Sequence, residues 1–313
     1  KHTWKITGIL LIMFFITQLI GLAIVYSYTP IVQEVEINGT VQNVTTNPLP
    51  FGMEPPPEAQ EQNMLPSIIF AFVLAILLVI LITKLKAAIF MKAWFFIVTT
   101  LVLGITINAG LRYFVNQYTA WIALAIALPL AVYKIFKRNI LVHNITELMI
   151  YPGIAAVFVP LLRVWTVVIL LILISIYDMW AVWNSGIMQK MAKYQMNELK
   201  IFAGFFVPYL SKKQREKIKK AKKAKGKKKE MKMKINIAIL GGGDVVFPII
   251  TAGIILRTLG ILPALAVSVC ATLALGLLFA YSKKGKFYPA MPFISAGLFV
   301  GIGLAYLIAG LIA

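Results

Sequence analysis

Apolar runs of about 20 residues recur along this 313-residue chain and constrain its fold more than any other feature. A helix rises 1.5 Å per residue, so about 20 apolar residues cross the roughly 30 Å hydrocarbon core of a bilayer. Hydrophobic residues make up 60% of the chain and charged residues 13%, against about 45–50% and 25% in soluble domains. We therefore expect an all-α, multi-pass integral membrane protein. The nine predicted transmembrane helices span residues 6–28, 65–83, 87–109, 118–136, 146–162, 164–187, 235–256, 260–281 and 288–312.

Lysine and arginine are concentrated in every second connection between the predicted helices. The other connections are poor in them: three hold one arginine each, Arg112, Arg163 and Arg257. The 29–64 loop has neither lysine nor arginine and carries five of the eleven acidic residues. Because basic loops stay on the cytoplasmic side, the N-terminus is predicted to be cytoplasmic and the C-terminus extracytoplasmic. Five prolines between positions 48 and 57 predict extended or poorly ordered chain in the outer loop. The basic connections lie at residues 1–5, 84–92, 134–138, 190–234 and 283–286.

The predicted helices form one membrane-embedded unit in two parts, 1–188 and 235–313, separated by a polybasic cytoplasmic loop at 189–234. Seventeen of the 31 basic residues lie between Lys190 and Lys234. Such segments beside membrane spans bind anionic lipid headgroups. Nucleic-acid binding is the alternative, but the lysine-dense core at 212–234 has no aromatic residue to stack on bases. We therefore expect an anionic lipid partner and no nucleic acid.

Metal and cofactor chemistry finds little support in the residues. Cys270 is the single cysteine, which excludes an intramolecular disulfide and a cysteine-cluster metal site. The two histidines, His2 and His143, are far apart in the sequence. We expect no metal and no organic cofactor.

The only two aspartates, Asp178 and Asp244, each lie inside a predicted transmembrane helix. An ionisable group in hydrocarbon costs about 3 to more than 10 kcal/mol, so it usually marks function. Counted at 1.5 Å per residue from Lys190 and Lys234, both carboxylates reach similar depths, about 18 and 15 Å. Two close carboxylates share one proton, the state in which one activates water and the other donates to a carbonyl oxygen. The alternative is an ion pair or a backbone hydrogen bond for each aspartate, but neither apolar stretch contains a lysine or arginine partner.

Residues next to the aspartates favour a catalytic pair. Tyr177 can donate to or brace a carboxylate, although a tyrosine in a bundle is often only packed. Gly241, Gly242 and Gly243 directly precede Asp244. Consecutive glycines serve tight helix packing or an opening for substrate backbone and water, and their position before an intramembrane aspartate favours the opening.

At these residues the chain resembles the presenilin and signal peptide peptidase family of intramembrane aspartyl proteases. The family pattern is Tyr-Asp in the sixth helix, Gly-x-Gly-Asp in the seventh and Pro-Ala-Leu at the start of the ninth. This sequence has Tyr177-Asp178, Gly241-Gly242-Gly243-Asp244 and Pro289-Ala290-Met291-Pro292 in the same order. The small size and simple basic loop are similar to prokaryotic, particularly archaeal, members, which implies the cell membrane as location.

One departure and one competing match accompany the resemblance. Met291 stands where the family has leucine, a change that packing should tolerate. A literal Pro-Ala-Leu occurs at 263–265, but the topology places it at the outer end of the eighth helix. We therefore assign the family motif to Pro289, Ala290 and Met291, with a nonhelical start of the ninth helix that exposes backbone groups.

The resemblance implies an endopeptidase that hydrolyses peptide bonds within transmembrane segments of other proteins, with Asp178 and Asp244 as catalytic residues. The predicted topology matches the presenilin orientation, which implies substrates whose N-terminus is outside. Strand-like backbone near 289–291 or in the basic loop next to the seventh helix is predicted to pair with an unwound substrate. A homo-oligomer is also considered. The alternative is a proton-coupled transporter or cation channel, which also uses intramembrane carboxylates, although the chain shows no internal repeat.

Overall fold

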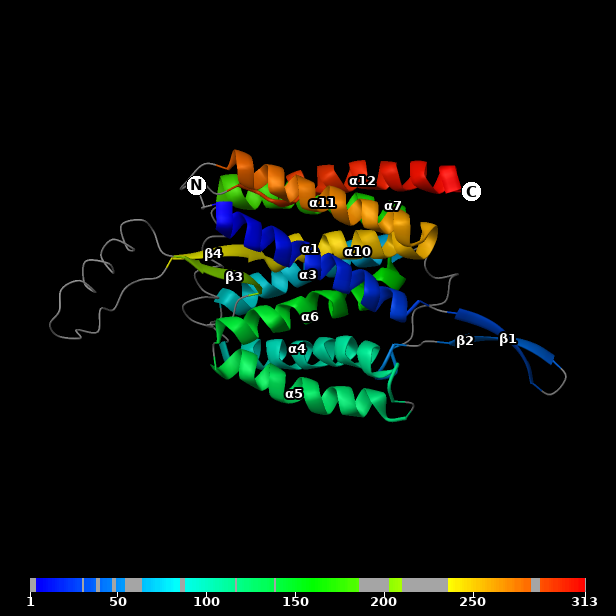
Figure 1. Cartoon of the computed structure of the whole chain (residues 1–313). Coiled ribbons are helices and arrows are strands. Elements are labelled where there is room, and N and C mark those ends of the chain that lie inside the picture. The colour runs from blue at the N-terminus through cyan, green and yellow to red at the C-terminus, as the bar shows by residue number, and fades with distance from the viewer. Residues whose placement is uncertain are drawn as a thin grey trace.

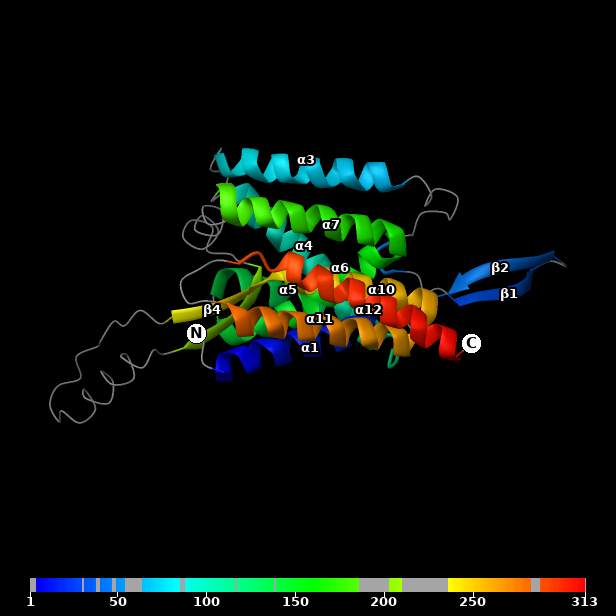
Figure 2. The ribbon, with the colours of Figure 1, turned by 90° about the horizontal axis from the view of Figure 1, so that it is seen from above.

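The computed structural model shows a bundle of long helices running side by side along one axis, with a β-hairpin at each end (Figure 1). Figure 2 gives the same bundle from above. The structure describes residues 4–29, 31–37, 40–46, 49–53, 64–84, 88–115, 117–137, 139–185, 203–209, 236–282 and 288–312.

Nine long helices make up the described bundle, and eight of them are long and apolar enough to cross a membrane. The prediction of a multi-pass helical membrane protein is confirmed. The helix α3 is not among those eight, so the count of nine crossings stays a prediction. The helices are α1 (Trp4–Ser27), α3 (Met64–Lys84), α4 (Ala88–Leu111), α5 (Thr119–Lys137), α6 (Ile140–Phe158), α7 (Val164–Trp180), α10 (Gly242–Leu259), α11 (Ile261–Tyr281) and α12 (Met291–Ile312).

Two helix ends differ from the predicted bounds for local reasons. The fifth predicted span begins at 146, whereas α6 begins at Ile140 because the Asn139 side chain caps it, with Oδ1 accepting from Leu141 N over 2.9 Å. A single 3₁₀ turn, η1 (Val159–Leu161), follows α6. The sixth predicted span runs to 187, whereas α7 ends at Trp180 and continues as a π-helical turn, η2 (Ala181–Ser185).

Two antiparallel hairpins accompany the helices. Strand-like backbone was expected in the basic loop, where β3 lies, but pairing of strands within the chain was not predicted. Strands β1 (Ile31–Ile37) and β2 (Thr40–Thr46) pair within the 29–64 loop, where extended or poorly ordered chain was expected. Strands β3 (Gly204–Tyr209) and β4 (Asn236–Gly241) pair at the opposite end of the bundle (Figure 1). The β-branched residues of β1 and β2 suit a pleated ribbon.

The ribbon of β3 and β4 corrects the prediction that a seventh helix runs from 235. Residues 236–241 are strand, and α10 begins only at Gly242. An apolar run of this kind is compatible with either structure locally, and pairing with β3 decides it. The count of 15 Å from Lys234 to Asp244 is therefore wrong, because it used the helical rise for residues that are extended.

The helix α10 lies at the centre of the bundle and contacts α1, α6, α7, α11 and α12. Most of its residues from Val245 to Leu256 are buried. Close approach is possible at Gly253, where a Cβ would lie 2.7 Å from a methyl group of Val159. Asp244 lies in the first turn of this central helix and is half-buried.

The first turn of α1 lies at the end of the bundle that carries β3 and β4, and the last turn of α12 lies at the other end (Figure 1). The predicted topology requires this separation of the chain ends. Which end faces the cytoplasm stays a prediction.

Candidate active site

Asp178 lies near the end of α7 and meets the beginning of α12. Its Oδ2 accepts a hydrogen bond from the backbone N–H of Met291 over 3.1 Å, and the backbone of Ala290 also donates to the carboxylate. The side chain is 7% exposed. The first N–H groups of a helix have no partner within it, so Asp178 satisfies donors that α12 would otherwise leave free.

Asp244 lies in the first turn of its own helix, α10. Its carboxylate accepts from the backbone N–H of Gly241, the residue that precedes the helix. This contact has the form of a capping box, in which the third helical residue bonds back to the N-cap. The partial positive charge at the start of α10 also favours an anion at this position.

The two aspartates therefore share an arrangement, since each carboxylate lies at the N-terminus of a helix. Asp178 is at the start of α12 and Asp244 at the start of α10. They are close enough for the charge of Asp178 to act on Asp244. The helices that carry them are joined through α12, which contacts both α7 and α10. A hydrogen bond of 2.9 Å from Ser175 Oγ to Ser295 Oγ fastens α7 to α12 one turn from Asp178.

The three glycines before Asp244 have different surroundings. Gly241 ends β4 in an extended conformation, and Gly242 begins α10 directly beneath the ring of Tyr151. Gly243 is exposed, with open space where a side chain would be. There is thus open space at Gly243 and tight packing at Gly242. Of the two roles expected for the glycines, close packing applies to Gly242 and an opening to Gly243.

The segment Pro289-Ala290-Met291-Pro292 lies beside Asp178, with Pro289 and Ala290 outside the helix and Met291 as its first residue. A nonhelical start of this helix was predicted. Pro292, in the first turn, loses nothing by lacking an N–H. The literal Pro-Ala-Leu at 263–265 opens α11, at the end of the bundle away from β4 (Figure 1).

Tyr177 occupies the neighbouring position on α7. Its ring centroid lies 6.3 Å from that of Trp180. The phenol is partly exposed. A bracing role for Tyr177 stays a prediction.

Two polar residues next to α10 escaped the sequence analysis. Gln18 of α1 is fully buried, and its Nε2 donates to the carbonyl oxygen of Val245 over 3.2 Å. Tyr151 of α6 is also buried, and its hydroxyl would lie 3.0 Å from a Cβ at Gly242. Both contact the turn that carries Asp244. A glutamine inside an apolar run was a usable signal, whereas a tyrosine in such a run is common.

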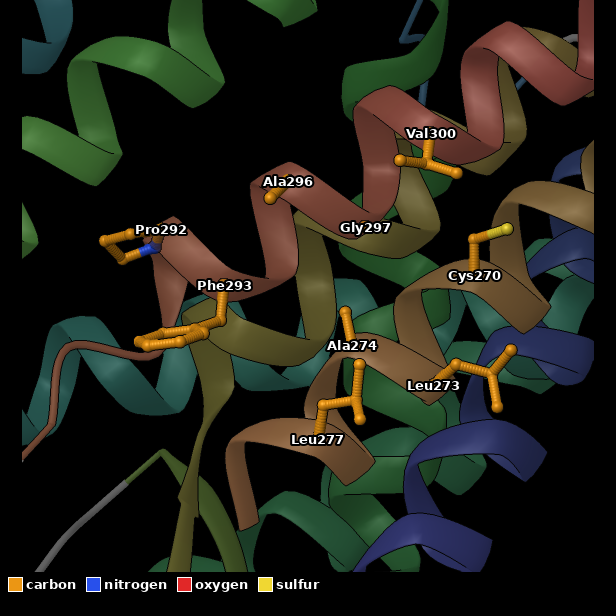
Figure 3. A pocket seen from close by; sticks show the side chains of 9 residues that line it. All are labelled: Cys270, Leu273, Ala274, Leu277, Pro292, Phe293, Ala296, Gly297 and Val300. Atoms are coloured by element: carbon orange, nitrogen blue, oxygen red, sulfur yellow. The ribbon is translucent and has the colours of Figure 1, made fainter. Parts of the chain in front are cut away.

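An apolar groove of about 580 Å³ begins at the N-terminal end of α12, where the helix meets Asp178 (Figure 3). Pro292 and Phe293 of its first turn line the groove, and Cys270 of α11 lies further along it. Gly297 lies against α11, where a Cβ would be 2.9 Å from the Cys270 carbonyl oxygen. The groove therefore follows the α11–α12 contact away from the aspartates.

Comparison with known proteins identifies the class of this site. The family model described as signal-peptide peptidase, presenilin aspartyl protease matches residues 41–312. The chain belongs to this family. It is therefore an aspartic-type intramembrane protease, a hydrolase, and the resemblance drawn from the sequence motifs is confirmed. The search of curated proteins found no significant match.

Solved structures of two crystal forms show the same fold. A presenilin family intramembrane aspartate protease in space group C222 is 16% identical with a TM-score of 0.57, covering 96% of this chain and 99% of that one. The P2 form is 17% identical with a TM-score of 0.57, covering 96% of each chain. Family membership gives no support to the transporter or channel alternative.

Proposed function

We propose that this protease hydrolyses peptide bonds within transmembrane segments of other proteins, using Asp178 and Asp244 as a general acid/base pair. The observation that carries the proposal is the shared placement of the two carboxylates. Each lies at a helix N-terminus, and the charge of Asp178 acts on Asp244. Helix N-termini are ready-made sites for negative charge.

The chemistry follows from one proton shared by two carboxyl groups. The ionised member accepts a proton from water as the water attacks the scissile carbonyl carbon, and the protonated member donates to the carbonyl oxygen. The intermediate then collapses: one of its hydroxyl groups returns a proton to the pair, the C–N bond breaks, and the leaving amine takes a proton from the pair. The backbone donors of Met291 and Gly241 hold the two carboxylates in place. No metal or organic cofactor enters this scheme.

The free edge of β4 offers a place for an unwound substrate. Gly242 N donates to Ala203 O over 3.2 Å. Since hydrogen bonding alternates along an antiparallel ladder, the N–H and C=O groups of Ile237 and Ile239 point away from β3, whereas the N–H of Gly241 is used by Asp244. The sheet has only these two strands among the described residues. A substrate strand added to this edge would run toward Gly241, three residues before Asp244.

A cavity of about 600 Å³ beside α10 suits the helical remainder of a substrate. It lies between α3, α6, α7 and α10, and Val246 and Phe247 line it within one turn of Asp244. The other lining residues are almost all apolar, as a transmembrane helix requires. They are Ser67, Ile68, Ala71, Ile154, Phe158, Leu161, Leu162, Leu170 and Ile250.

Several further expectations remain proposals. We propose a prokaryotic cell membrane as the location, a cytoplasmic N-terminus and a preference for substrates whose N-terminus is outside. Anionic lipid is proposed as the partner of the 190–234 loop, most of which lies outside the described residues. A homo-oligomer is compatible with these proposals.

Reconstitution in liposomes with a single-span substrate tests the function. The wild-type protein should release two fragments, while Asp178→Asn and Asp244→Ala should release none and should melt within a few degrees of wild type. Retained cleavage by Asp244→Ala would contradict the mechanism. An ion-leak measurement on the same liposomes tests the channel alternative, and a leak lost in the aspartate variants would favour it.

A further inference from the structure

The first turn of α6 contacts the edge of β3 that faces away from β4. The side chain of Asn144 makes two hydrogen bonds with the backbone of Phe206. Asn144 Nδ2 donates to Phe206 O over 2.8 Å, and Phe206 N donates to Asn144 Oδ1 over 3.0 Å. A carboxamide and a peptide group carry the same donor and acceptor, so Asn144 occupies the place of a third strand.

This contact agrees with the ladder of the ribbon. Phe206 is opposite Ile239, a pair whose N–H and C=O groups do not bond across the ribbon. The N–H and C=O groups of Phe206 therefore point away from β4 and toward α6. Pro208, opposite Ile237, is the next residue of β3 whose backbone does not bond to β4. Its lack of an N–H therefore costs the ribbon no hydrogen bond.

His143 adds a second attachment two residues along β3. Its Nε2 lies 2.8 Å from the Gly204 carbonyl oxygen, which accepts a hydrogen bond from the ring. The imidazole also stacks on Phe206, with ring centroids 4.6 Å apart. Glu147 lies beside His143, with Oε1 3.5 Å from Nε2, and the same oxygen lies 2.5 Å from Lys134 Nζ of α5.

The attachment bears on the candidate active site through the register of the ribbon. Gly204, held by His143, is opposite Gly241, and Gly241 donates to Asp244. The outer edge of β3 contacts α6, so within the described part of the chain the edge of β4 is the one without a partner strand. One face of the ribbon packs against the bundle, since its side chains are buried. They are Phe205, Val207, Ala238 and Leu240.

We propose that Asn144 and His143 are positioning residues that hold β3 against α6 and thereby set the register in which a substrate strand on β4 reaches Asp244. This inference rests on the proposed function. It assigns to the beginning of α6 a role in substrate affinity and in the choice of the scissile bond, with no contact to the reacting atoms.

The variant Asn144→Ala tests the inference, with Asn139→Ala as matched control. Both asparagines lie at the start of α6, but Asn139 caps the helix and bonds Leu141 instead of β3. Loss of two hydrogen bonds should raise KM roughly tenfold and leave kcat within about twofold. Mass spectrometry of the products should show additional cleavage sites. Asn139→Ala should keep the wild-type KM and products even where its melting temperature falls.

A binding measurement separates this inference from the proposed function. A labelled single-span peptide is titrated into Asp244→Ala with and without Asn144→Ala, so that no cleavage is needed. Binding weakened by Asn144→Ala supports the inference even if wild type fails to cleave, a result that would sink only the proposed function. Unchanged affinity, or products identical to those of wild type, would overturn it. If Asn144→Ala does not fold, Asn144→Gln, which keeps both the donor and the acceptor but displaces them by one methylene, should show a smaller change in the same direction, and no change would overturn it.

Discussion

The backbone N–H of Met291 donates a 3.1 Å hydrogen bond to Oδ2 of Asp178. The contact joins the first residue of α12 to the end of α7, and it uses a backbone group, so the hydrogen bond does not depend on the side chain at position 291, which is buried in the core. It also gives the nonhelical segment before α12 a defined task, which is to present donors to a carboxylate.

Substitutions at Met291 should separate the backbone group from the side chain. Met291→Leu should keep cleavage within about twofold, because the N–H remains and the buried volume is nearly conserved. Met291→Pro should keep the fold, since proline is favoured at the first helical position, but it removes the donor. A lost hydrogen bond to a charged group is worth about 1.5–3 kcal/mol, so cleavage should fall tenfold or more. Equal activity of the two variants in liposomes would show that the contact is dispensable.

The glycines before Asp244 should respond differently to alanine. At Gly242 a Cβ would lie 3.0 Å from the buried ring of Tyr151, so Gly242→Ala should lower stability by about 1–3 kcal/mol. At Gly243 nothing lies within 4 Å, so Gly243→Ala should melt at or above the wild-type temperature, as alanine favours helix. Its cleavage rate should nevertheless fall if substrate backbone uses this space. Thermal melting and cleavage are measured on both variants, and a wild-type rate for Gly243→Ala would argue against substrate approach there.

The contribution of the buried Gln18 side chain to stability should depend on its N–H donor. Its Nε2 bonds Val245 O, while its Oε1 has no partner among the described residues. Gln18→Glu replaces the donor by a second acceptor facing a carbonyl, which should cost at least about 2 kcal/mol. Gln18→Leu removes one hydrogen bond and one unsatisfied oxygen together, so its stability should change by less than about 1 kcal/mol. Melting in lipid nanodiscs compares them, and equal destabilisation would contradict this account.

The ion pair of Lys134 and Glu147 should show strong coupling. Both side chains are buried, at 7% and 2% exposure. Lys134→Met alone should cost about 3–5 kcal/mol, because it leaves a buried carboxylate without its partner. The double variant Lys134→Met/Glu147→Met should recover most of that loss. A double-mutant cycle of unfolding free energies measures this, and simple additivity of the two substitutions would exclude a coupled pair.

Local composition was enough to predict the membrane class, because the transfer of an apolar run into hydrocarbon depends on its length and residue types. It was also enough to single out Asp178 and Asp244, since a carboxylate in such a run is costly wherever its neighbours lie. The motifs around them then led to the family that the comparison confirmed.

The failures share a physical cause, which is dependence on partners distant in the sequence. Residues 236–241 fit a helix as well as a strand by composition, and they are strand because β3 pairs with them across more than 25 intervening residues. The roles of Gln18 and Asn144 were equally hidden, since each bonds a backbone group of a remote segment.

By itself, the sequence determined that this chain is a helical membrane protein with two exceptional carboxylates and the motifs of an aspartyl protease family. Tertiary structure alone decided where the seventh helix starts, which Pro-Ala segment lies at Asp178 and which edge of β3 contacts α6. Hydrophobic transfer is a property of each segment, whereas hydrogen bonds between backbone and side chains exist only once the segments meet.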